Sequence, residues 1–184
     1  MPLTSSAMLP LHTIAPEFKL LDVVSNKEHS LSSLKSKQGT VIMFICNHCP
    51  FVKHIRLELA QLAVEYKKQG IAFVAINSND VTNYPEDSPE KMKVFIQELN
   101  NPFPYLYDET QSVAKAYHAA CTPDFFVFDK SMRCAYRGQM DDSRPGNDIP
   151  VTGSDLRSAI DNLLANKPIT VDQKPSMGCN IKWK

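Results

Sequence analysis

The sequence predicts an α/β sandwich in which a mixed central sheet carries helices on both faces. Two continuous apolar runs, at residues 40–45 and 71–76, are typical of strands buried on both faces. A helical apolar period lies between them, so this segment forms a β-α-β unit with parallel strands and a right-handed crossover. Two further runs, at 124–129 and 132–137, are close enough in sequence to form an antiparallel hairpin.

The other elements follow from apolar periods and turn residues. The long helix extends from Phe51 to Gln69 and ends before Gly70, a residue common after helix ends. A second helix begins with Ser88 as N-cap and Pro89 at the first position. The remaining expectations are a strand at 17–23, short helices at 29–34 and 110–118, polar loops at 77–87 and 138–153, an extended link at 103–108 and a final helix at 155–166.

The length and the charge favour a single domain that does not bind nucleic acid. The 184 residues suit a single domain spanning 1–184, with an irregular lead-in at about 1–14 and a tail at about 167–184. Lys+Arg and Asp+Glu both total 20, so no basic field favours nucleic acid. We expect neither a signal peptide nor a membrane span, and therefore a cytosolic, reducing location. Five cysteines in that setting are not expected to form a disulfide scaffold.

Cys46-Asn47-His48-Cys49 joins the first buried strand to the long helix. A thiolate at a helix N-terminus faces free backbone N–H groups and the positive end of the helix dipole, which lowers its pKa. A protonated His48 adds positive charge beside the sulfurs. Pro50 is tolerated because the first helical turn needs no intrahelical donor. The motif therefore predicts a redox-active thiol pair, with no cofactor.

Two other interpretations of this pair are open. Both cysteines could be structural, or they could hold a metal ion together with His48 or His54. Structural zinc takes four ligands, and the other three cysteines are scattered along the chain. A metal-handling or redox-sensing binding module is therefore an alternative from a different class.

Thr122-Pro123, directly before the strand at 124–129, is consistent with a cis-prolyl turn. Together with the CxxC pair, it resembles the thioredoxin superfamily. Within it the chain is similar to the redoxin branch, which includes the alkyl hydroperoxide reductase/thiol-specific antioxidant proteins and the TlpA/ResA-like oxidoreductases. The opening Ala15-Pro16-Glu17-Phe18 is similar to that branch's start, and residues 175–183 look like the ending of a bacterial subgroup of thioredoxin-like proteins. The resemblance implies a thioredoxin-like three-layer sandwich.

The resemblance also implies roles for the site residues. Cys46 would be the exposed attacking thiol with the lowered pKa, and Cys49 the buried, protonated resolving thiol. Thr122 and a cis Pro123 would face both sulfurs and help to present the substrate backbone. Peroxiredoxins carry T-x-x-C-P at this place, so a peroxidase interpretation would make Cys49 the peroxidatic thiol, with Cys46 in the position of the threonine.

The chain also departs from the thioredoxin pattern around the thiols. No Asp or Glu lies between Glu28 and Glu58, so the strand before Cys46 lacks the buried acid that thioredoxins use as a proton acceptor. Ile45 stands where a tryptophan usually precedes the pair, and His48 stands where proline is usual. These differences weaken the case for general protein reductase activity.

Several other residues carry weaker signals. Cys121 is close enough to Pro123 to lie near the site, although a buried small side chain is the simpler explanation. Cys134 is expected to be structural, and Cys179 lies in a tail that could fold back or be exposed. Lys53 and His54 could raise the local potential, and a solvated helix face explains them equally well. The polar loop Asp141-Asp142-Ser143-Arg144 could border the cleft, but for Arg144 an ordinary surface ion pair is the simpler explanation.

The sequence therefore predicts a thiol–disulfide oxidoreductase that acts through Cys46 and Cys49. Cys46 attacks a substrate disulfide, and Cys49 resolves the mixed disulfide. A dithiol electron donor of unknown identity must then regenerate the pair. The alternative enzyme is a thiol peroxidase that reduces hydroperoxides.

Overall fold

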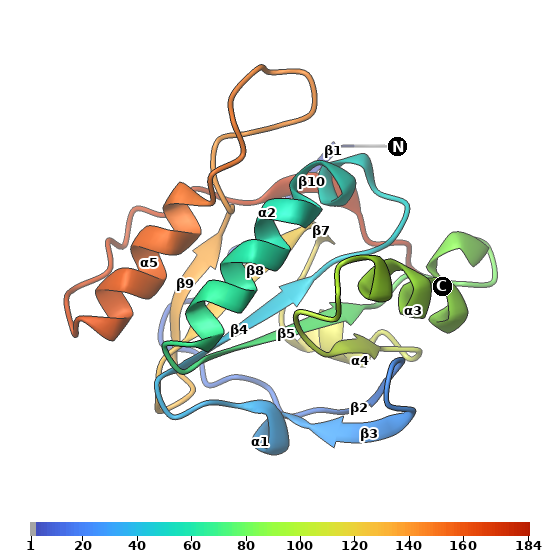
Figure 1. The fold of residues 1–184 in the computed structure, drawn as a ribbon, viewed down its shortest axis with the longest axis horizontal. Helices are drawn as coiled ribbons and strands as arrows, with labels where there is room; N and C mark the ends of the chain where they lie inside the picture. The colour runs from blue at the N-terminus through green and yellow to red at the C-terminus, as the bar shows by residue number, and fades with distance from the viewer. Residues whose placement is uncertain (1–2) are drawn as a thin grey trace.

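A computed structural model describes residues 3–184 and contains a seven-stranded mixed sheet (Figure 1). Its strand order is β3-β2-β6-β5-β4-β8-β9. The strands are β2 (Lys19–Asp22), β3 (Lys27–Ser30), β4 (Gly39–Phe44), β5 (Ile71–Asn77), β6 (Tyr105–Tyr107), β8 (Asp124–Phe128) and β9 (Cys134–Gly138). β4 and β5 pair in parallel, and β8 pairs antiparallel with both β4 and β9. The predicted β-α-β unit and hairpin are therefore confirmed.

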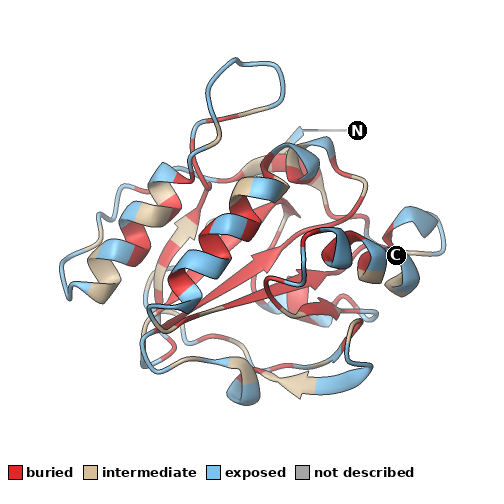
Figure 2. Cartoon of the chain, viewed as in Figure 1, coloured by how far each residue is buried: buried red, intermediate tan, exposed pale blue. Residues whose placement is uncertain are grey.

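Within residues 3–184, five α-helices cover the sheet on two faces. They are α1 (Leu31–Leu34), α2 (Pro50–Lys67), α3 (Pro89–Glu98), α4 (Ser112–Ala116) and α5 (Ser154–Leu164). The alternating residues Val41 and Met43 of β4 face a core shared with α2, α3 and α5. Ile42 and Phe44 face the opposite core, which contains side chains of α1 and α4. Figure 2 shows the central strands buried between these layers, as the predicted three-layer sandwich requires.

A second, three-stranded sheet joins the two ends of the chain to the site region. Its order is β1-β10-β7, with β1 (Leu3–Ser5), β10 (Met177–Asn180) and β7 (Cys121–Thr122) all antiparallel. The lead-in at about 1–14 is expected to be irregular, and that expectation is wrong for Leu3–Ser5, which form β1; residues 1 and 2 lie outside the described part. The tail at about 167–184 contributes β10. Short strands without apolar alternation are invisible in a local pattern because their partners are distant in sequence.

Glycine is required where β10 crosses the prolyl segment. A Cβ on Gly178 would collide with the carbonyl oxygen of Thr122 and lie 3.3 Å from Cδ of Pro123. The backbone of β10 therefore packs directly on these two residues.

None of the helices in residues 3–184 combines the length and the apolar character needed to cross a bilayer.

Candidate active site

Cys49 is the N-cap residue of α2, because Pro50 occupies the first helical position and starts the helix there. Cys46 lies between the end of β4 and this cap, one turn before the helix. Of the two cysteines, it is therefore Cys49 whose sulfur lies at the free N–H groups of the first turn. The side chain of Cys49 makes no capping hydrogen bond to the backbone N–H groups of the first turn. The helix dipole is therefore only one of the influences on the pKa of Cys49.

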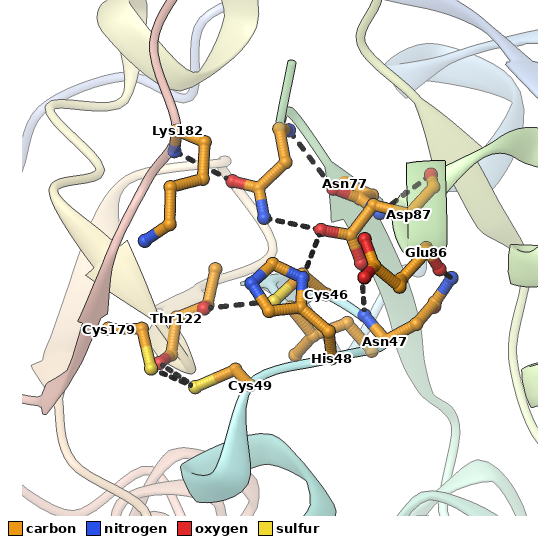
Figure 3. Close-up of polar contacts among 12 residues, drawn as sticks. Cys46, Asn47, His48, Cys49, Asn77, Glu86, Asp87, Thr122, Cys179 and Lys182 are labelled. Carbon is orange, nitrogen blue, oxygen red and sulfur yellow. Dashed lines mark hydrogen bonds and ion pairs between the residues drawn. The ribbon is translucent and has the colours of Figure 1, made fainter. Parts of the chain in front are cut away.

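Both sulfurs are buried against Thr122. Cys46 and Cys49 are each 0 % exposed, so the expected exposure of Cys46 is wrong. The Sγ of Cys46 lies 3.3 Å from Oγ1 of Thr122, and the Sγ of Cys49 lies 3.3 Å from the Thr122 carbonyl oxygen (Figure 3). The peptide bond between Thr122 and Pro123 is cis, as the sequence analysis expected.

The acidities of the two thiols are opposite to the expected ones. A hydrogen bond from the Cys46 thiol, and then one from the Cys179 thiol, lower the pKa of Cys49 to about 5 despite burial. The same Cys46–Cys49 hydrogen bond, burial and the nearby Asp87 carboxylate raise the pKa of Cys46 well above its ordinary value. These surroundings favour Cys49 as the thiolate and Cys46 as the proton-bearing partner, because Cys49 collects the donors. This direction is the opposite of the predicted one.

Cys179 is the third thiol of the site. It lies on β10, and its Sγ is 2.8 Å from Sγ of Cys49. Burial, followed by the hydrogen bond to Cys49, raises the pKa of Cys179 to about 12. The tail therefore folds back onto the site, which is one of the two arrangements expected for Cys179 from the sequence.

Asp87 supplies an acid that the strand before Cys46 lacks. It ends the 3-10 turn η1 (Pro85–Asp87), and its fully buried carboxylate is 2.6 Å from Nδ1 of His48. It also accepts from the Asn47 backbone N–H and from Nδ2 of Asn79, both at 2.7 Å. Burial opposes ionisation, but these bonds hold the pKa of Asp87 below its usual range.

His48 is held in one orientation by this carboxylate. Its ring also stacks on Tyr84, with centroids 5.7 Å apart. The hydrogen bond to Asp87 raises the pKa of His48 against the opposing effect of burial. Nε2 of His48 is buried and has no hydrogen-bond partner among the described residues. Asp87 therefore favours the protonated form of His48, and Nε2 is the ring nitrogen left for a substrate atom.

The metal interpretation finds three donors close together. Within residues 3–184, ligand atoms of Cys46, His48 and Asp87 lie within 4.8 Å of one another. Structural zinc takes four ligands, one more than this set provides. The Asp87 carboxylate also already accepts three hydrogen bonds. His54, the other histidine considered, instead binds Oγ of Ser143 at 2.7 Å. The geometry therefore favours acid–base chemistry over metal binding.

The other candidate residues lie outside the thiol contacts. Sγ of Cys121 faces the carbonyl oxygens of Pro123 and Ser176 at 3.7 and 3.9 Å, and burial raises its pKa. Cys134 is buried in the core of the opposite face. Arg144 donates to the carbonyl groups of Asp141 and Ser143 within its own loop, and Lys53 is exposed.

Sequence reasoning missed Asp87 as a partner of the thiol pair. No local pattern marks it, because it reaches His48 across 39 residues of sequence. A signal did exist for Cys49: proline at the first helical position makes the preceding residue the N-cap.

The fold and this site place the chain among the thiol redox proteins with a thioredoxin fold. The AhpC/TSA family model matches residues 11–137, which is more than half of the chain, and the chain belongs to this family. The comparison with curated proteins gives no match.

Solved structures share the fold of this chain. An uncharacterised conserved protein from Geobacillus kaustophilus is 60% identical, with a TM-score of 0.98 over 100% of this chain and 97% of the other. A hypothetical protein from Sinorhizobium meliloti is 48% identical, with a TM-score of 0.95 over 98% of both chains. Peroxidoxin BcpB from Mycobacterium tuberculosis shares the fold at 17% identity, with a TM-score of 0.65 over 86% of this chain and 98% of the other.

Proposed function

We propose that the chain is a dithiol peroxidase, in which Cys49 reduces a hydroperoxide and Cys46 then forms a disulfide with it. One observation carries the proposal: Cys49 caps α2 and contacts a second thiol in a site that a terminal strand covers. This arrangement reverses the roles that the sequence alone suggested for the two cysteines, and it moves the peroxidase alternative ahead of the oxidoreductase.

The cover over the site favours a small substrate. β10 pairs with β7, so the backbone edge beside Pro123 is occupied by the chain itself. Both sulfurs of the pair are fully buried. A polypeptide disulfide would have to displace β10 before it could lie along that edge, whereas a hydroperoxide is small enough to need no such strand pairing.

The chemistry balances with the groups present. The Cys49 thiolate attacks one oxygen of the hydroperoxide; the O–O bond breaks, an alcohol or water leaves, and Cys49 becomes a sulfenic acid. Cys46 then attacks the Cys49 sulfur, which forms the disulfide and releases water. A dithiol donor reduces that disulfide by two exchange steps and is itself oxidised. The dithiol donor and the cytosolic location are predictions from the sequence.

His48 is the group that can protonate the leaving oxygen. The hydrogen bond to Asp87 raises the pKa of His48, which favours the protonated ring, and its Nε2 has no hydrogen-bond partner among the described residues. Loss of an alkoxide or hydroxide without a proton is unfavourable, and a positioned general acid contributes about 10²–10⁴-fold to such a step.

The second candidate is the thiol–disulfide oxidoreductase. The Thr122 carbonyl at 3.3 Å from Sγ of Cys49, next to a cis proline, supports it. In this version Cys49 attacks a low-molecular-weight disulfide, and Cys46 resolves the mixed disulfide.

Turnover with dithiothreitol as the donor separates the two functions. We expect hydrogen peroxide or an organic hydroperoxide to be reduced faster than a small disulfide such as oxidised glutathione. Cys49→Ser should abolish turnover, while Cys134→Ala, which removes a thiol of the opposite core, should leave it unchanged. Faster turnover of the disulfide would favour the second candidate, and no turnover of either would favour the redox-sensing module.

A further inference from the structure

The C-terminal strand occupies the place of a bound peptide. β10 runs antiparallel to β7, with Cys179 opposite Thr122 and Asn180 opposite Cys121. Addition of an antiparallel strand to a free sheet edge is a common mode of peptide recognition. Here the added strand belongs to the same chain, and it carries a cysteine at the residue that faces the active thiol.

The strand is fixed by contacts on both sides of Cys179. The Lys182 backbone donates to Oδ1 of Asn79 at 2.9 Å, and its carbonyl accepts from the Asp80 backbone and from Nε2 of Gln111 at 2.8 and 2.7 Å. Before the cysteine, Gly178 lies against Thr122 so closely that no side chain fits. The register that brings Cys179 to Cys49 is therefore built into the fold.

The sulfurs of Cys49 and Cys179 are almost at bonding distance. Their separation is 2.8 Å, whereas a disulfide bond is about 2.05 Å long, so closure needs a movement of less than about 1 Å. Cys46 precedes the helix that Cys49 caps, and its Sγ lies 3.3 Å from Oγ1 of Thr122, the residue whose carbonyl oxygen lies 3.3 Å from Sγ of Cys49 (Figure 3). Cys49 thus has one neighbouring thiol in its own CxxC motif and a second on β10.

We propose that Cys179 is a third redox-active thiol, which takes over the disulfide from Cys46. The Cys179 thiol attacks the Cys49 sulfur of the Cys46–Cys49 disulfide; the new Cys49–Cys179 bond forms as the old bond breaks. Cys46 leaves as a thiolate and receives the proton that Cys179 loses. The exchange is neutral in electrons and needs no further oxidant.

The transfer moves one end of the disulfide from the segment before α2 to β10. Cys179 is the least enclosed of the three cysteine residues, at 4 % exposed against 0 % for the other two. A dithiol donor therefore meets the disulfide at β10 instead of at the start of α2. In the cell this step rests on the proposed function, which supplies the oxidised Cys46–Cys49 pair.

Tryptic peptide mapping of the oxidised protein distinguishes the two disulfides. Cys46 and Cys49 lie together on peptide 38–53, whereas Cys179 lies on 158–182, since Lys167 and Lys174 both precede proline. The full-length protein is oxidised with diamide, alkylated in acid and digested. We expect wild type to yield both peptide 38–53 lighter by two hydrogens and a cross-link between 38–53 and 158–182. In Cys46→Ser the cross-link should be the main disulfide.

Two variants keep the test falsifiable. Cys179→Ala should abolish the cross-link and leave the lighter peptide 38–53, and Cys134→Ala should change neither product. If the cross-link is absent from oxidised wild type, the proposal is overturned. Because diamide oxidises thiols directly, a cross-link in a protein that does not turn over hydroperoxide would refute the peroxidase function alone.

Discussion

Replacing Asp87 by asparagine keeps the shape of the side chain and removes its charge. The carboxylate accepts three hydrogen bonds, from His48 at 2.6 Å and from Asn47 and Asn79 at 2.7 Å. An asparagine can accept through one oxygen only, and its own NH₂ group must then face one of these donors. The substitution therefore weakens all three bonds at a fully buried position.

The size of the effect follows from the kind of bond that is lost. A hydrogen bond to a charged group contributes about 1.5–3 kcal/mol, against about 0.5–1.5 kcal/mol for a neutral one, so three bonds give a loss of roughly 3 kcal/mol. The pKa of His48, which the Asp87 bond raises, should fall because burial then dominates. The lower pKa leaves less of His48 protonated near pH 7.5, and we expect turnover there to fall about tenfold or more.

The assays are urea unfolding and the pH profile of hydroperoxide turnover. Wild-type activity should rise through the low pKa of the Cys49 thiolate and fall as His48 loses its proton. Asp87→Asn should move the alkaline limb to lower pH. Asp142→Asn, which breaks an exposed 2.7 Å ion pair with Lys174, is the matched control and should change neither measurement.

The pH dependence of stability has a defined sign for both members of the pair. A lowered Asp87 pKa stabilises the fold above the unfolded-state value, and that stability is lost as pH falls through the folded value. A raised His48 pKa stabilises the fold at lower pH, and this is lost as pH rises through the folded value. If Asp87→Asn has wild-type stability and an unshifted alkaline limb, the pair plays no part in catalysis.

Three further changes test other parts of the site. Cys46→Ala should raise the pKa of Cys49, measured as alkylation rate against pH, and Cys46→Ser should raise it less because its hydroxyl can still donate; an unchanged pKa would remove Cys46 as the donor. Gly178→Ala should push β10 off Thr122, speed alkylation of the native thiols and cost about 1–3 kcal/mol in urea unfolding; a crystal structure with β10 unmoved would contradict this. Burial raises the pKa of Asp124 to about 7, so native stability should fall as pH rises from about 4 to 7, and melting curves of Asp124→Asn should show a flatter dependence over that range.

The sequence by itself determined the elements that local patterns encode. Apolar runs and periods located β4, α2 and β5, because a buried strand and an amphipathic helix differ in residue spacing. Glycine and proline marked the ends of α2. The junction of strand and helix also identified the CxxC pair as the centre of the site, since that junction is where backbone donors are free.

Only the tertiary structure decided which sulfur is the thiolate and which groups surround it. Cys49 and Cys179 are 130 residues apart, and His48 and Asp87 are 39 apart, so no local period relates them. The pKa of a thiol depends on the donors and charges that meet it in space, whatever its place in a motif. Cys49 receives bonds from Cys46 and Cys179, whereas Cys46 lies near the Asp87 carboxylate. That difference in surroundings, set by the packing of η1 and β10 around α2, is the physical reason that the pKa of Cys49 is lowered while that of Cys46 is raised.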